Sequence, residues 1–303
     1  MQTARNKRIT PLKGVRILSL ALNLPGPAAL MRLYQMGATC TKLEPLAPSG
    51  LVTGDPMGFY KPAAYETMHQ GVRVVQADLK TPRGQTTLHK LLAKTDVLIT
   101  SFRPSALAKL GLDWKTLHRL YPNLCMVSVV GAFGPRAEEP GHDLTYLAEN
   151  GLVNGLDLPA TLYADMGGSL MITEAVLQAL FLRQSRVRQN GLGVFQEIAL
   201  NDAANYLALP RTWRLTTPDG DVGGAHAGYK IYPCKNGRVA VAALEPHFAK
   251  RLCLVVGLEE KDMHSMHTLK THKAFAKFFA SQTRQKLDRL AVSKDIPMYT
   301  LAK

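Results

Sequence analysis

The sequence lacks the features of several common protein classes. Its four cysteines, at positions 40, 125, 234 and 253, form no CxxC pair, which argues against a disulfide framework and indicates a reducing compartment. No apolar run is long enough to cross a bilayer, and no apolar segment of a secretory signal follows the basic N-terminal residues. The sequence therefore predicts a cytoplasmic location and no membrane partner.

Several catalytic motifs are also missing. The absence of GxGxxG, the P-loop pattern, HExxH and GxSxG argues against the commonest nicotinamide, nucleoside triphosphate, zinc-protease and serine-hydrolase sites. Three histidines, His264, His267 and His272, lie near one another in the sequence, but no cysteine or carboxylate partner completes a metal-binding set. No metal site is therefore expected.

Acidic residues are scarce relative to basic ones. The chain has 37 Lys and Arg against 23 Asp and Glu, a net charge of +14. The basic residues are dispersed, and the aromatic residues, only 7% of the chain, do not alternate with them as they do in single-strand nucleic-acid binders. A phosphate-bearing small molecule therefore accounts for the charge better than nucleic acid, although any single basic residue also fits a solvated surface.

Strand and helix patterns alternate through the first two thirds of the chain. Segments with the apolar spacing of helices lie between the strand patterns. Two of these predicted helices are short and meet at Gly111. Apolar runs typical of buried strands occur at 15–21, 40–44, 72–79, 96–100, 124–130 and 194–200. This alternation predicts an α/β fold with a doubly wound parallel sheet.

Other segments carry different signals. Residues 45–70 have proline and glycine loop signals without a period, a long apolar helix is expected from Leu170, and residues 228–248 predict a hairpin followed by a helix. The basic tail after residue 249 is expected to be helical. A chain of 303 residues exceeds one usual core, so we expect a large domain over 1–200 and a smaller α+β domain over 201–303.

His142 stands where a helix is expected to begin, in GHDLTYLAENGL at residues 141–152. Asp143 is expected to cap this helix, and Leu144, Leu147 and Ala148 recur at helical spacing. The unpaired N–H groups of a helix start lower the pKa of a histidine and suit a neutral base near pH 7. A polar histidine in a capped turn explains the same residues, so this stretch alone leaves both interpretations open.

Asp165, in YADMGG, is either a site carboxylate or the N-cap of the helix that follows. Gly167 and Gly168 would let the backbone approach a ligand closely. Arg103, between a strand and a proline-led helix, suits a phosphate but also fits a solvated loop. Glu245, before a proline at a strand-to-helix junction, is either a site residue or part of a helix start.

Taken in order, these stretches resemble the family III CoA-transferases, and among them the acyl-CoA racemases. The resemblance runs from Leu12 to about Pro297 and is strongest in the succession DVLI, FRP, LGLD and PNL. It continues through GHDLTYLAENGL, YADMGG and AALEPHF. It implies a Rossmann-like large domain, a smaller domain and an interlocked homodimer. It also implies a longer interval between His142 and Asp165, and a longer C-terminal part, than this sequence has.

The resemblance further implies the chemistry. His142 and Asp165 would be the acid and base that invert the α-carbon of a 2-methylacyl-CoA thioester through an enolate, with Glu245 orienting His142. Coenzyme A would belong to the substrate, with no tightly bound cofactor, and Arg103, Lys80, Gly167 and Gly168 would contact it. N–H groups at a helix start after Gly167 would stabilise the enolate oxygen. The alternatives are a CoA-transferase with Asp165 as nucleophile and a non-catalytic CoA-binding protein.

Overall fold

The computed structural model describes residues 9–185, 191–259 and 263–302, which form two compact units that divide between Ala208 and Leu209. The division falls inside helix α9 (Leu200–Thr212). Each unit has its own apolar core. None of the helices in these ranges combines the length and the apolar character of a membrane-spanning segment.

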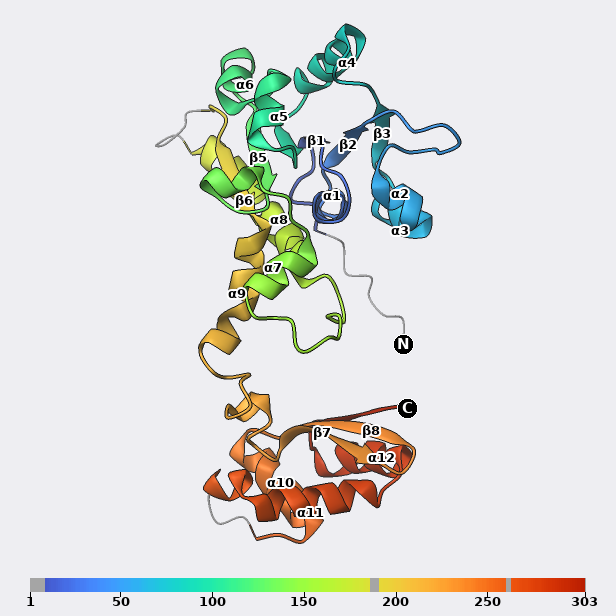
Figure 1. The fold of residues 1–303 in the computed structure, drawn as a ribbon, viewed down its shortest axis with the longest axis vertical. Helices are drawn as coiled ribbons and strands as arrows, with labels where there is room; N and C mark the ends of the chain where they lie inside the picture. Colours follow the sequence, from blue (N-terminus) through green and yellow to red (C-terminus); the bar gives the residue numbers. More distant parts are fainter. Residues whose placement is uncertain (1–8, 186–190, 260–262, 303) are drawn as a thin grey trace. The chain divides into compact units, whose positions relative to one another are not determined.

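The first unit is built around a six-stranded sheet in the order β3-β2-β1-β4-β5-β6, with every pair parallel (Figure 1). The strands are β1 (Arg16–Ser19), β2 (Thr39–Glu44), β3 (Arg73–Gln76), β4 (Val97–Thr100), β5 (Cys125–Val130) and β6 (Phe195–Ala199). All six predicted strands are therefore present. The order reverses between β1 and β4, which is the pattern of a doubly wound sheet and confirms the predicted fold class.

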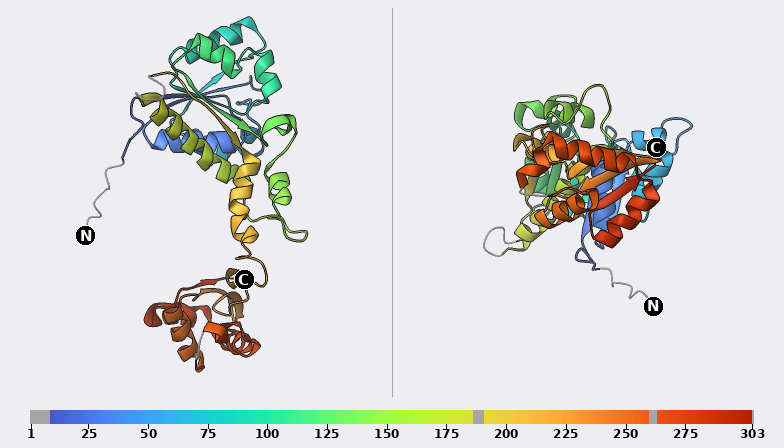
Figure 2. Two further views of the ribbon diagram at one scale, coloured as in Figure 1. Left: turned by 90° about the vertical axis from the view of Figure 1, so that its left-hand side faces the viewer. Right: turned by 90° about the horizontal axis from the view of Figure 1, so that it is seen from below.

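Helices cover both faces of this sheet, as the left view of Figure 2 shows. One face packs against α1 (Pro25–Gln35) and α8 (Tyr163–Gln184). The other packs against α4 (Pro82–Leu92), α5 (Pro104–Lys109) and α6 (Trp114–Leu120). Neighbouring residues within a strand belong to opposite layers, as Ile17 and Leu18 do in β1, because side chains alternate along a strand.

The second unit contains an antiparallel sheet in the order β7-β8-β9, with β7 (Tyr229–Cys234), β8 (Gly237–Ala242) and β9 (Met298–Leu301). Helices α10 (Pro246–Val256), α11 (Leu269–Ala280) and α12 (Arg284–Lys294) complete it. The hairpin and the helices were expected from the sequence. Strand β9 was not expected, because a segment of only four residues is too short to show the alternating pattern of a strand.

Two predictions about local structure are wrong. The segment 45–70 is not a continuous loop, since α2 (Pro56–Tyr60) and α3 (Pro62–Met68) lie within it, each beginning with a proline whose fixed φ suits a first helical turn. The helix expected from Leu170 begins earlier, at Tyr163. Gly167 and Gly168 therefore lie inside α8, where they do not interrupt the helix.

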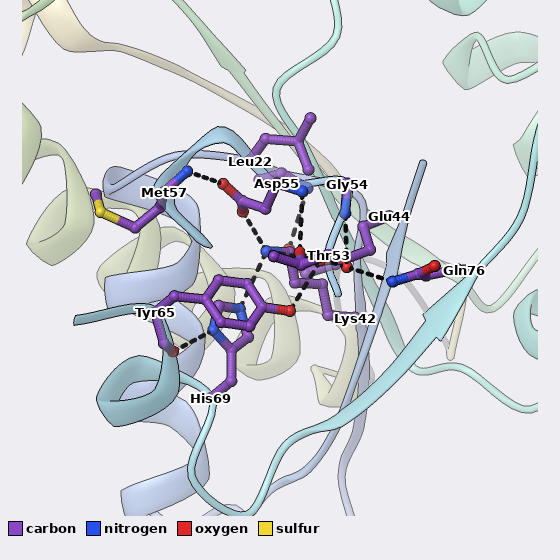
Figure 3. A network of polar contacts seen from close by, with 12 residues as sticks. Leu22, Lys42, Glu44, Thr53, Gly54, Asp55, Met57, Tyr65, His69 and Gln76 are labelled. Atoms are coloured by element: carbon purple, nitrogen blue, oxygen red, sulfur yellow. Dashed lines mark hydrogen bonds and ion pairs between the residues drawn. The ribbon is translucent and has the colours of Figure 1, made fainter. Parts of the chain in front are cut away.

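A buried polar cluster joins the ends of β2 and α2 (Figure 3). Lys42 is fully buried, and its ammonium group pairs with Asp55 and lies 3.5 Å from Glu44 Oε2. Lys42 Nζ is also 3.0 Å from Nε2 of His69, whose Nδ1 lies 2.7 Å from the Tyr65 carbonyl oxygen. Because that carbonyl only accepts, Nδ1 carries the proton and Nε2 accepts from Lys42.

Removing Asp55 takes one of two carboxylates away from the buried Lys42 and leaves the backbone N–H groups of Asn23 and Met57 without their acceptor. We expect Asp55→Ala to lower the free energy of unfolding of the first unit by about 3 to 5 kcal/mol. The triple variant Lys42→Met/Glu44→Gln/Asp55→Ala should recover part of this loss, because it removes the cation and both of the carboxylates that surround it. Urea denaturation measures both, with Glu174→Gln on the exposed face of α8 as a control expected to change stability by less than about 0.5 kcal/mol. Equal stability of wild type and Asp55→Ala would contradict the account.

Candidate active site

A cavity of about 270 Å³ lies at the carboxyl edge of the parallel sheet, where the strand order reverses between β1 and β4. Its walls include Leu22, Asn23 and Pro25 after β1, Ser101 and Arg103 after β4, and residues 129–131 at the end of β5. Connections leaving β1 and β4 in opposite directions open a crevice at this point in doubly wound sheets, where ligands bind. His142 and Asp165 line the same cavity, so the structure brings three predicted site residues together.

His142 is the N-cap residue of α7 (Asp143–Glu149). Its backbone N–H donates to Thr145 Oγ1 at 3.1 Å, and its carbonyl oxygen accepts from the Thr145 hydroxyl at 2.7 Å. His142 and Thr145 form the capping box of α7, in which the imidazole lies beside the Thr145 backbone N–H. The helix start thus fixes the position of His142 on the wall of the cavity.

Asp143 does not cap α7 as the sequence suggested, because it is the first residue of that helix. Its carboxylate is buried and accepts a hydrogen bond at 3.0 Å from the backbone N–H of Asp165, in the first turn of α8. It therefore ties the residue after His142 to the backbone of Asp165. A charged acceptor at a helix N-terminus also stabilises α8.

Asp165 is the third residue of α8 rather than its N-cap, which is Leu162. Its carboxylate accepts no hydrogen bond from any residue that the structure describes. Burial first, and then the nearby charge of Asp143, raise the pKa of Asp165 to about 6, while His142 acts in the opposite direction. A carboxyl group with this pKa changes protonation state near neutral pH, as a group that both takes and returns a proton must.

Tyr146, which the sequence did not single out, forms another part of the wall. Its hydroxyl lies so close to two turns that a Cβ atom on either Gly131 or Gly141 would come within 2.5 Å of it. A side chain at either position would therefore displace the buried Tyr146 ring. The only sequence signal for Tyr146 is its position three residues after Asp143, which places both residues on the buried side of α7.

Gly167 and Gly168 are predicted to contact coenzyme A, but neither lines the cavity that holds Asp165. A Cβ on Gly168 would lie 2.4 Å from Leu200 Cδ2, and one on Gly167 would lie 3.2 Å from Leu207 Cδ1. The two glycines thus let α8 approach α9. Because α8 starts at Tyr163, no helix starts after Gly167 to stabilise an enolate oxygen, and that expectation is wrong.

A second cavity, of about 1050 Å³, opens at the same edge of the sheet. Lys80 lines it together with Lys109, and apolar side chains including Leu43, Leu46 and Phe102 form much of the wall. Phe102 stands between Ser101 and Arg103 of the smaller cavity, so one loop after β4 borders both spaces. The arrangement suits a ligand with a small reacting end and a large, anionic, partly apolar handle.

Glu245 belongs to the second unit, where it is the exposed N-cap residue of α10. Its carbonyl oxygen accepts from the N–H groups of Phe248 and Ala249, and its side chain does not cap the helix. The carboxylate is therefore available. Its predicted role in orienting His142 stays a prediction.

The fold and the cavity define a doubly wound α/β protein with a histidine and a half-buried carboxyl group at the switch point of its sheet. The chain matches the model of CoA-transferase family III over residues 12–303 and belongs to that family. It is 30% identical over 295 residues to alpha-methylacyl-CoA racemase of Mus musculus, covering 90% of this chain and 73% of the relative. It is also 30% identical over 285 residues to succinate–glutarate CoA-transferase of Agrobacterium fabrum, covering 83% and 68%.

Solved structures share the fold. A hypothetical protein from Mycobacterium tuberculosis superimposes with a TM-score of 0.80 at 22% identity, covering 97% of this chain and 86% of that one. A CaiB/BaiF family protein from Brucella suis gives 0.76 at 23% identity, covering 97% and 85%. The relatives make this chain an acyl-CoA transferase or racemase, and leave open which of the two.

The raised pKa of Asp165 predicts how stability depends on pH. Its ionised form is disfavoured in the folded state, so the stability it contributes is complete below pH 4 and is lost as pH rises through about 6. Asp165→Asn should therefore stabilise the first unit by about 2 to 3 kcal/mol at pH 8 and change it little at pH 4. Chemical denaturation at both pH values checks this, with the exposed Asp157→Asn as control. A loss of stability at pH 8 would show the sign to be wrong.

Proposed function

We propose that this protein inverts the α-carbon of a 2-methylacyl-CoA thioester by proton transfer through an enolate. The observation that carries the proposal is that His142 and Asp165 line one cavity, at the starts of two neighbouring helices. One removes the α-proton and the other delivers a proton to the opposite face of the carbon. In the reverse direction the two residues exchange roles.

The protonation states support these roles. A carboxyl group with a pKa of about 6 is a stronger base than an ordinary aspartate and still gives up its proton at neutral pH. Asp143 contributes to this value through its charge and also holds the Asp165 backbone. The same buried carboxylate thus holds Asp165 in place and adds to the effect of burial on its basicity.

The larger cavity is proposed to hold the coenzyme A part of the substrate. Lys80 and Lys109 supply positive charge for its phosphates, and the apolar wall accommodates the adenine. Arg103, in the smaller cavity, is proposed to meet a polar part of the same molecule nearer the thioester. Coenzyme A enters as part of the substrate and leaves with it.

A second candidate, CoA transfer between carboxylic acids, is favoured by one observation. The Asp165 carboxylate accepts no hydrogen bond from the described residues, as an attacking nucleophile requires. In that reaction Asp165 would attack the thioester carbonyl, forming an anhydride and releasing the CoA thiolate. The thiolate would then attack the Asp165 carbonyl and release the first acid, and a second carboxylic acid would take over CoA by the reverse of these steps. That second acid is required for transfer but not for racemisation.

Incubation of an (R)-2-methylacyl-CoA in D2O tests the proposal. Wild type should introduce deuterium at the α-carbon and form the (S) thioester without an acyl acceptor, as mass spectrometry and chiral analysis would show. His142→Gln and Asp165→Asn should each abolish inversion, while each retains exchange on the face served by its remaining group. His264→Gln, an exposed histidine of the second unit, is the matched control. Transfer of CoA to a free acid without deuterium uptake would replace the proposal with the transferase.

The pH dependence tests the role of Asp143. In the direction in which Asp165 removes the proton, kcat/KM should fall below about pH 6, because protonated Asp165 is no base. Asp143→Asn keeps an oxygen for the Asp165 N–H but removes the charge, so the acidic limb should move to lower pH by up to about one unit. An unchanged limb in this variant would rule out the electrostatic role of Asp143.

A further inference from the structure

Asn23 holds an unusual backbone conformation on the wall of the smaller cavity. It follows β1 in the connection to α1 and has a φ of 63°, in the left-handed region that residues other than glycine rarely adopt. Asparagine is among the few side chains that tolerate this region. Asn23 lines the same cavity as His142 and Asp165.

A buried acid fixes this conformation. Asp55 Oδ1 accepts hydrogen bonds from the backbone N–H of Asn23 at 3.1 Å and from that of Met57 at 2.9 Å. The other oxygen pairs with the fully buried Lys42, and Asp55 is itself 1% exposed (Figure 3). One carboxylate therefore joins the loop after β1 to the start of α2, and it cannot rotate away without breaking a buried ion pair.

The last residue of α2 reaches the Asn23 side chain. The Tyr60 hydroxyl donates to Asn23 Oδ1 at 3.2 Å. Burial, then Asp55, and then the charge of Asp165 raise the pKa of Tyr60, so this hydroxyl lies within the field of the cavity carboxylate. Since Oδ1 is occupied, the free end of the amide is Nδ2, for which the described residues provide no acceptor.

We propose that Asn23 is a substrate-binding residue whose Nδ2–H donates a hydrogen bond to an oxygen of the acyl group, and that the Lys42–Asp55 pair and Tyr60 position it. The proposal rests on the acyl-CoA activity proposed above. Two oxygens have the required chemistry, the thioester carbonyl and a carboxylate further along the acyl chain. In this arrangement Asp55 acts only through Asn23 and is a positioning residue.

Asn23→Gly separates the amide from the backbone, because glycine keeps the left-handed conformation without a side chain. Asn123→Gly is the matched control, since Asn123 is exposed before β5, at the amino end of that strand. The substrates are an unsubstituted 2-methylacyl-CoA and succinyl-CoA. We measure α-deuterium exchange, CoA transfer, and calorimetric affinity for each thioester and for free CoA.

Asn23→Gly should lower kcat/KM and thioester affinity at least tenfold, with free CoA affinity and melting temperature unchanged. Equal losses for both substrates identify the thioester oxygen as the acceptor, and a loss for succinyl-CoA alone identifies the distal carboxylate. Wild-type rates and affinities in the variant would overturn the proposal. If wild type neither exchanges nor transfers, the proposed activity fails, while the affinity ratio between thioester and CoA still decides the role of Asn23.

A double-mutant cycle tests the positioning role of Asp55. Asp55→Asn should lower kcat/KM in wild type but have much less effect when Asn23 is already glycine, because the amide it positions is gone. A purely structural role would give the same loss in both backgrounds, and that result would overturn this part of the proposal. Tyr60→Phe should behave as Asp55→Asn does, with a smaller loss.

Discussion

The reversal of strand order between β1 and β4 is the constraint on which the site depends. Because the chain leaves β1 toward one side and β4 toward the other, no connection covers the edge between them. The loops after both strands then border a common cavity, and helices α7 and α8 bring His142 and Asp165 to it. The chemistry is thus placed by the topology of the sheet and not by a local motif.

Buried carboxylates refine this placement on both sides of the cavity. Asp143 holds the Asp165 backbone and raises the pKa of its side chain, while Asp55 holds the Asn23 backbone and the start of α2. Each accepts backbone N–H groups from a segment far away in the sequence. A buried donor or acceptor that loses its partner keeps the full free-energy cost of desolvation. Breaking these hydrogen bonds is therefore unfavourable, and they hold the wall of the cavity in place.

Much of the fold follows from the sequence, since apolar runs and helical spacing mark all six parallel strands and the hairpin. The errors have local causes. Pro56 and Pro62 begin helices in a segment whose composition is typical of a loop. Gly167 and Gly168 suggested that α8 starts after them, but these glycines lie inside α8 and allow α9 to pack closely against it. The helix or strand propensity of a segment carries no information about packing against a segment that is distant in the sequence.

The same distinction applies to the site. His142, Asp165 and Arg103 stand out through local punctuation and through the ordered resemblance, and the structure gathers them in one cavity. Asn23, Tyr60 and the bridging role of Asp143 could not be predicted, because they depend on contacts between segments with no shared sequence signal.

The central claim is that His142 and Asp165 act on opposite faces of one carbon. A crystal structure with a bound 2-methylacyl-CoA, determined for the Asp165→Asn variant to prevent turnover, tests it most directly. The account predicts that the α-carbon lies between the His142 ring and the side chain at position 165, with CoA in the larger cavity. A complex with both groups on the same face of the α-carbon, or with the thioester outside the smaller cavity, would contradict it.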